Sequence, residues 1–213
     1  MIKLKELIEL QSMVYTETIK PKHKKRFTRP TPSFHENLVM PKYQPPSNDS
    51  STTLDEIKYL SSIKPNKDKV LKFDKVKETF KPYAEELGIY DYIKKIEHES
   101  VKFIMKLKYE YNRPRPFQVA EFYGIDLNGT ETDSMKTPSF PSGHAIQGYL
   151  IADILSKHNP SNTKLYQQVG EDIAHSRIIG KAHYPSDKKY GKKVAKALFK
   201  GLKWFLNYQQ YIY

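Results

Sequence analysis

The feature that most constrains this fold is a helical period that runs from about residue 90 to residue 112. Apolar or small side chains recur there every three or four positions, as on one face of a helix: Ile93, Ile96, Ser100, Ile104, Leu107 and Tyr111. Pro114 and Pro116 end the pattern, because proline disrupts a helix interior. The sequence lacks the period-two alternation of Val and Ile that marks a half-buried strand. These features predict an all-α fold.

Six further segments have helical character, and two stretches between them do not. The predicted helices cover residues 1–14, 53–64, 74–87, 143–158, 162–180 and 185–207, with Thr53 as an expected helix cap. Residues 20–52 are rich in Pro, Lys, Ser and Asn without a period, and 117–141 are typical of a loop. We therefore expect one helical domain over residues 45–213, preceded by a partly extended N-terminal arm over residues 1–44.

The composition excludes several classes of protein. None of the 213 residues is a cysteine, which rules out disulfide scaffolds, Cys-ligated zinc and thiol catalysis. The longest apolar runs, such as residues 149–152, are far too short to span a membrane. Glu6 and Glu9 interrupt the apolar residues near the N-terminus, so we expect no secretory signal peptide. The expected protein is soluble and cytoplasmic.

A formal net charge of +12 favours phosphorylated or polyanionic partners through long-range attraction. Seven lysines between residues 188 and 203 are interleaved with apolar residues, as on the outer face of an amphipathic helix. A solvated basic surface explains most of these lysines. We do not expect a nucleic-acid-binding module, because the sequence carries no signature of a nucleic-acid-binding fold.

Polar side chains interrupt the apolar stripes at the ends of the predicted helices. Helical spacing carries six of them onto core-facing rows: Lys108, Arg115, His144, Arg177, His183 and Asp187. In the segment 162–180, for example, the stripe of Leu165, Val169 and Ile173 continues into Arg177. Buried charges cost free energy unless they are paired or bind a ligand. Each residue alone has a structural explanation, but together they predict a site for a compact anion.

A helix start strengthens this interpretation. Ser142 occupies a natural N-cap position before the helix predicted to begin at residue 143. The free backbone N–H groups of a first helical turn bind anions, and Gly143 lets a ligand approach the backbone closely.

Three motifs that contain these residues occur in order along the chain. The first runs from Lys108 to Arg115-Pro116, the second is Pro141-Ser142-Gly143-His144, and the third joins Ser176-Arg177 to His183 and Asp187. With this set the chain resembles the class A bacterial nonspecific acid phosphatases. They belong to the superfamily of type 2 phosphatidic acid phosphatases and vanadium haloperoxidases, and the resemblance implies the helical bundle of that superfamily.

The first motif can be placed in two ways. Lys106 to Arg113-Pro114 also satisfies its spacing, but Phe117 after Arg115-Pro116 matches the ending seen in the class A branch. We therefore prefer Lys108 and Arg115. The chain departs from the branch in two respects, since its members are usually exported and the loop between the first two motifs is only loosely similar.

The resemblance implies metal-independent hydrolysis of soluble phosphate monoesters, without a cofactor. His183 would attack phosphorus and form a phosphohistidine, Asp187 would orient its ring, and His144 would protonate the leaving group. The phosphate oxygens would be bound by Lys108, Arg115, Ser142, Gly143 and Arg177. Because one histidine must be neutral while the other is protonated, we expect an acidic pH optimum.

The expected ligands are a small phosphorylated substrate and, in the same site, phosphate or vanadate. Two enzymatic alternatives remain open. A vanadium haloperoxidase would use His183 to hold vanadate, and a lipid phosphate phosphatase would act on membrane substrates. The sequence also leaves open whether the chain forms a homo-oligomer.

Overall fold

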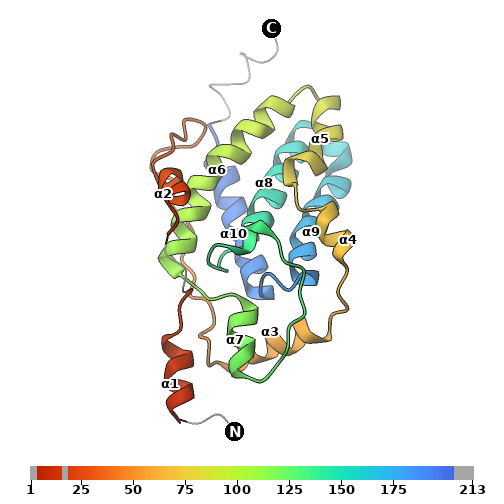
Figure 1. The fold of residues 1–213 in the computed structure, drawn as a ribbon. Helices are drawn as coiled ribbons and strands as arrows, with labels where there is room; N and C mark the ends of the chain where they lie inside the picture. Colours follow the sequence, from red (N-terminus) through yellow and green to blue (C-terminus); the bar gives the residue numbers. More distant parts are fainter. Residues whose placement is uncertain (1–3, 16–18, 204–213) are drawn as a thin grey trace.

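The computed structural model describes residues 4–15 and 19–203. This part of the chain forms ten α-helices and two 3₁₀ turns and contains no β-strand, which confirms the predicted all-α class (Figure 1). The elements are α1 (Leu4–Ser12), α2 (Pro21–Phe27), α3 (Ser51–Ser62), α4 (Lys67–Lys72), α5 (Val76–Glu86), α6 (Tyr90–Tyr111), α7 (Pro116–Phe122), η1 (Asp133–Met135), α8 (Gly143–His158), η2 (Pro160–Asn162), α9 (Thr163–Ile179) and α10 (Pro185–Lys200).

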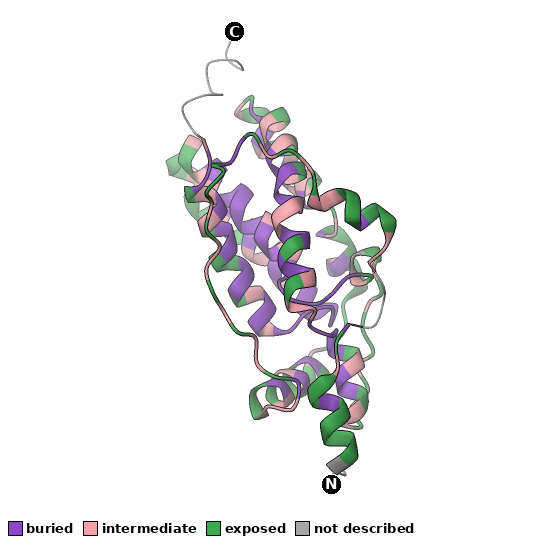
Figure 2. Ribbon diagram, turned by 90° about the vertical axis from the view of Figure 1, so that its left-hand side faces the viewer, coloured by how far each residue is buried: buried purple, intermediate pink, exposed green. Residues whose placement is uncertain are grey.

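Helix α8 forms the centre of the bundle, and its sequence explains this position. Its buried side chains point in every direction around the axis, as Tyr149, Leu150, Ala152 and Leu155 illustrate. A helix that is apolar all round must be covered on all sides. Helices α5, α6, α9 and α10 provide that cover. Figure 2 shows buried residues concentrated in the central helices, whereas α1 at the edge is largely exposed.

Helices α8 and α9 pack closely because each presents a glycine at their contact. A Cβ atom added to Gly170 would lie 2.9 Å from the carbonyl oxygen of Gly148, and one added to Gly148 would lie 3.2 Å from that of Gly170. Larger residues would separate the two helices. Gly148 lies one turn from His144 and Gly170 two turns from Arg177, so this contact supports two of the predicted site residues.

The N-terminal segment follows the surface of the bundle and is anchored at residues 33–35. The backbone N and Oγ of Ser33 donate to the buried carboxylate of Glu99 at 2.9 and 3.1 Å. Phe34 is buried and forms an isolated antiparallel bridge with Leu202, beyond the end of α10. Further along, the ring of Tyr43 stacks against the aromatic core. The domain boundary at residue 44 stays a prediction.

The structure corrects several predicted boundaries. The segment 20–52, which has no helical period in its sequence, contains α2, and residues 117–122 of the predicted loop 117–141 belong to α7. The helix predicted over 74–87 is confirmed as α5, whereas α4, which ends just before Asp74, was not predicted. Asn66 caps α4, with its side chain accepting from the backbone N of Lys69 at 2.8 Å. Residues 204–207 of the last predicted helix lie outside the described residues.

Two side chains were assigned wrongly from their spacing. Ser50, not Thr53, caps α3, and its Oγ accepts from the backbone N of Thr53 at 3.1 Å. Leu165 is exposed, because the face of α9 that packs on α8 is that of Tyr166, Gly170 and Ile173. Among the described helices, none combines the length and the apolar character that a membrane crossing requires.

Candidate active site

Four of the predicted site residues line one cavity of about 280 Å³. Lys108 comes from the last turn of α6, Gly143 and His144 from the first turn of α8, and His183 from the loop before α10. Residues of α2 form another wall of the cavity. The cavity therefore lies where helix ends from distant parts of the chain converge.

His183 is held at both ring nitrogens. Its Nδ1 lies 3.0 Å from Oδ2 of Asp187, and its Nε2 lies 3.1 Å from Nη1 of Arg115. A guanidinium group can only donate, so Nε2 accepts this hydrogen bond and the ring proton is assigned to Nδ1, which donates to Asp187. Nε2 therefore carries a lone pair, which makes it the nucleophilic atom of the ring.

The charge state of His183 follows from its surroundings. The side chain is buried, and both burial and the positive charge of Arg115 lower the pKa of His183 well below its usual range. The hydrogen bond to Asp187 opposes this shift but does not overcome it. This shift favours the neutral form of the imidazole.

Asp187 is fully buried and is surrounded by donors. Oδ2 accepts from His183, from Oγ of Ser139 at 2.5 Å and from the backbone N of Tyr184 at 3.2 Å. Oδ1 accepts from Nη1 of Arg113 at 2.8 Å. Burial would raise the pKa of Asp187, but the charge of Arg113 and these hydrogen bonds outweigh it and hold the pKa well below the usual range. Asp187 is therefore an anion that orients His183.

Arg115 and Lys108 bring positive charge to the site, and both donate hydrogen bonds to backbone carbonyl oxygens. Nε and Nη1 of Arg115 donate to the carbonyl oxygens of Thr137 and Ala182 at 2.8 and 2.7 Å, and Nζ of Lys108 donates to that of Pro138 at 2.5 Å. Burial lowers the pKa of Arg115 to about 10. Burial and the nearby Arg115 lower the pKa of Lys108 well below its usual range. Two buried cations side by side favour an anion between them.

His144 and Arg177 meet at Asp74, between α4 and α5. Nη1 of Arg177 donates to Oδ1 of Asp74 at 2.8 Å, and Nε2 of His144 lies 3.0 Å from the backbone oxygen of Asp74. The hydrogen bond with His144 is the main reason that the pKa of Asp74 falls to about 2. Burial lowers the pKa of His144, while its contacts with Asp74 oppose that shift.

The start of α8 has the geometry that its sequence predicts. The side chain of Ser142 is the N-cap of the helix, and its Oγ accepts from the backbone N of Ala145 at 3.3 Å. A Cβ atom added to Gly143 would lie 3.3 Å from Ile104 and 4.0 Å from Cε of Lys108. A side chain at position 143 would therefore intrude between the helix start and Lys108.

The eight predicted site residues form one connected group, which Ser142 joins through its backbone N, 3.3 Å from the backbone oxygen of Asp187. Lys108, Gly143, His144 and His183 line the cavity, while Arg115 and Asp187 lie behind it in contact with His183. Arg177 also lies behind the cavity, and it reaches the group through Asp74. Its positive charge helps to lower the pKa of both Arg115 and His144, as expected for a close neighbour.

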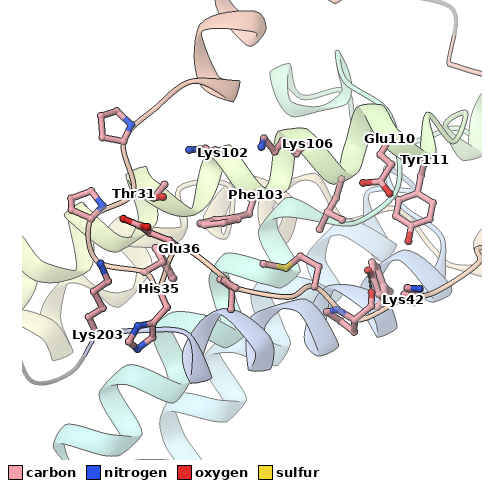
Figure 3. Close-up of a pocket in the computed structure, with 18 residues that line it drawn as sticks. Thr31, His35, Glu36, Lys42, Lys102, Phe103, Lys106, Glu110, Tyr111 and Lys203 are labelled. Atoms are coloured by element: carbon pink, nitrogen blue, oxygen red, sulfur yellow. Dashed lines mark hydrogen bonds between the residues drawn. The ribbon is translucent and has the colours of Figure 1, made fainter.

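The structure separates the two placements of the first motif. Arg113 donates to Asp187 and Ser186 and lies 3.3 Å from Glu56, whereas Lys106 is exposed on the opposite side of α6. Lys106 lines a larger pocket of about 660 Å³ between α6 and residues 30–42 (Figure 3). The preferred residues Lys108 and Arg115 are the pair that lies beside His183.

Three important residues were not predicted as members of the site. Arg113 was considered only as an alternative phosphate ligand, and Ser139 lies just before the second motif. Asp74 has no motif around it, so nothing in its spacing marks it. The described residues hold no group of three or more His, Asp or Glu side chains that could bind a metal ion.

Comparison with known proteins places the chain in a family. The profile of the PAP2 superfamily matches residues 100–210, which is more than half of the chain. The chain belongs to the PAP2 superfamily. The matched region contains all three motifs, whereas α2, Glu56 and Asp74 lie before it.

Individual relatives carry a consistent name. The chain is 38% identical over 82 residues to a non-specific acid phosphatase of Providencia stuartii, covering 38% of this chain and 32% of that protein. It is 33% identical over 89 residues to one of Salmonella typhimurium, covering 42% of this chain and 35% of the relative. The chain thus matches about a third of the length of these relatives.

Proposed function

We propose that this protein hydrolyses soluble phosphate monoesters through a phosphohistidine formed on His183. The observation that carries the proposal is the geometry of His183, whose Nδ1 is bound to Asp187 while its Nε2 lies beside Arg115. The relatives named non-specific acid phosphatases support the same reaction class.

The reaction takes place in two balanced steps. In the first, Nε2 of His183 bonds to phosphorus while the bond from phosphorus to the leaving oxygen breaks, and His144 gives its proton to that oxygen. Asp187 stabilises the positive charge that develops on the ring. In the second step water attacks phosphorus, His144 takes a proton from it, and the N–P bond breaks to release phosphate and neutral His183.

The positive charge needed for phosphate binding comes from the protein itself. Lys108, Arg115 and Arg177 stand where a metal ion would otherwise neutralise the phosphoryl oxygens, so the proposed reaction is metal-independent. Gly143 N–H and Ser142 add neutral donors at the start of α8. A phosphate dianion between Lys108 and Arg115 relieves the repulsion between them. Binding is therefore coupled to protonation of Lys108.

The two alternative functions would use the same cavity. A haloperoxidase would hold vanadate beside His183, and a lipid phosphate phosphatase would take a membrane substrate. The names of the matched relatives favour the acid phosphatase over both. Phosphate and vanadate are expected to bind this site as competitive ligands.

Replacing His183 by alanine removes the proposed nucleophile. We expect the rate of ester hydrolysis to fall by at least about 10⁴-fold, since the loss of a covalent nucleophile is seldom compensated. In the wild type, several esters in the presence of glycerol should give one ratio of glycerol phosphate to free phosphate, because all pass through the same phosphohistidine. A ratio that changes with the leaving group, or an acid-labile phosphoenzyme in His183→Ala, would contradict the assignment.

Two lysines of α6 allow a matched test of the phosphate ligands. Lys108→Met keeps most of the side-chain volume but removes the buried charge, and we expect kcat/KM to fall by about 10²- to 10³-fold. Lys106→Met, half a turn away on the exposed side, should retain activity within about twofold. A larger loss from Lys106→Met than from Lys108→Met would assign the first motif to the other pair.

The proposed roles of the two histidines predict an acidic pH optimum. His144 must carry a proton, and its pKa lies below the ordinary 6.5, so the active fraction falls as the pH rises through that lowered pKa. His183 stays neutral over the same range because its pKa is lower still. Asp74 raises the pKa of His144, so Asp74→Asn should move the alkaline limb of the kcat/KM profile to lower pH. A profile that is flat from about pH 5 to pH 9, or a move to higher pH, would refute the scheme.

A further inference from the structure

Helix α2 forms one wall of the proposed catalytic cavity. Lys22, His23 and Arg26 line the cavity together with His144 and His183. In Figure 1, α2 lies beside α6, although the two helices are separated by more than sixty residues in the sequence. This wall belongs to the N-terminal segment, outside the region that matches the superfamily.

The position of α2 is fixed through Tyr109 of α6. Nδ1 of the buried His23 lies 2.9 Å from the hydroxyl of Tyr109, and the ring of Phe27 meets the ring of Tyr109 edge to face at 5.7 Å between centroids. Tyr109 directly follows Lys108 in the chain. The contact therefore places α2 relative to the phosphate ligands and not merely on the surface of the bundle.

The charges of α2 are distributed unequally around its axis. The exposed Lys22 and the half-buried Arg26 are one turn apart on the face that lines the cavity, whereas Lys24 and Lys25, which are also exposed, do not line it. Among the described residues, neither Lys22 nor Arg26 has a carboxylate in salt-bridge contact, and partial burial together with repulsion from Arg29 lowers the pKa of Arg26. The cavity thus has two cations that the proposed reaction does not use.

The phosphoryl group that His183 attacks in the proposed reaction has enough hydrogen-bond donors without α2. Lys108, Arg115 and the start of α8 face it from one side, and α2 contributes its cations from another wall. A volume of about 280 Å³ approaches the lower end of the range for small-molecule sites, roughly 300 Å³, and exceeds what one phosphate needs. Asp133, the carboxylate of the cavity lining, is bonded to Lys136 at 2.8 Å and also feels the charge of Lys22. The bond to Lys136 reduces the effect of Asp133 on a second anion.

We infer that Lys22 and Arg26 form a second anion subsite, which binds the distal phosphate of substrates that carry two phosphate groups. The inference rests on the proposed function, because the proximal phosphate is the one that His183 attacks. Arg26 offers a planar set of N–H donors that suits a phosphate group, and Lys22 adds a point charge. The preferred substrate class is therefore a small bisphosphorylated ester and not a simple monophosphate.

Binding of two hydrolysis-resistant ligands tests the subsite without relying on catalysis. Propane-1,3-bisphosphonate and propylphosphonate differ only in the second anionic group, and calorimetric titration of the full chain gives both affinities. We expect the wild type to prefer the bisphosphonate by about tenfold or more, and the preference to shrink at high salt. In Lys22→Gln/Arg26→Gln the preference should fall to about twofold, the statistical factor for a ligand with two equivalent ends.

The same helix offers a matched control. Lys24→Gln/Lys25→Gln removes the same charge from α2 but leaves the cavity wall intact, so it should keep most of the wild-type preference. An unchanged preference in Lys22→Gln/Arg26→Gln, equal losses in both double variants, or an equal loss for both ligands would overturn the subsite. The last result would assign α2 a structural role alone.

Hydrolysis of propane-1,3-diol bisphosphate and of the monophosphate separates this inference from the proposed function. A bisphosphonate preference that depends on Lys22 and Arg26, without hydrolysis of either ester, would support the subsite and refute the phosphatase. Hydrolysis of both esters with equal kcat/KM per phosphate group, in the wild type and in Lys22→Gln/Arg26→Gln, would support the phosphatase and refute the subsite.

Discussion

The buried carboxylate of Asp187 is the interaction on which the site depends. It accepts from His183, Ser139, Arg113 and a backbone N–H, and these donors come from the end of α6, the segment before α8 and the start of α10. An unpaired buried carboxylate would cost several kcal/mol. The hydrogen bonds that offset this cost therefore keep three distant parts of the chain together at Asp187. The same hydrogen bonds set the tautomer of His183.

The charged side chains near Asp187 include more cations than anions. Lys108 and Arg115 have carbonyl oxygens as their hydrogen-bond acceptors, and Arg177 shares Asp74 with His144. Carbonyl dipoles orient these cations but do not neutralise them. In the proposed function this excess charge favours binding of a phosphate dianion. This balance is expected of a site whose ligand is a small, highly charged oxyanion.

The sequence predicts those parts of the molecule in which local patterns and packing agree. The period over 90–112 predicts α6 almost to the residue, and the three motifs contain every predicted ligand of the cavity. Helix α2 was not predicted, because its short run of Lys, His and Arg has no apolar stripe. It is held by Tyr109, eighty residues away in sequence.

Other misses have related causes. Asp74 acts from a connection between two short helices, where its contacts with His144 and Arg177 depend on tertiary structure alone. Arg113 lies two residues before Arg115, and only the geometry of the chain sends one guanidinium to Asp187 and the other to His183. The exposed Leu165 shows that apolar spacing alone does not fix which face of a helix is covered.

The protonation of the His183 ring tests the central claim most directly. Nitrogen-15 NMR of histidine-labelled protein at neutral pH distinguishes the two neutral tautomers and the imidazolium by their chemical shifts and couplings. The contacts with Asp187 and Arg115 predict a neutral ring that is protonated at Nδ1 and unprotonated at Nε2. A ring protonated at Nε2, or a charged ring at neutral pH, would contradict the account, because His183 would then have no lone pair with which to attack phosphorus.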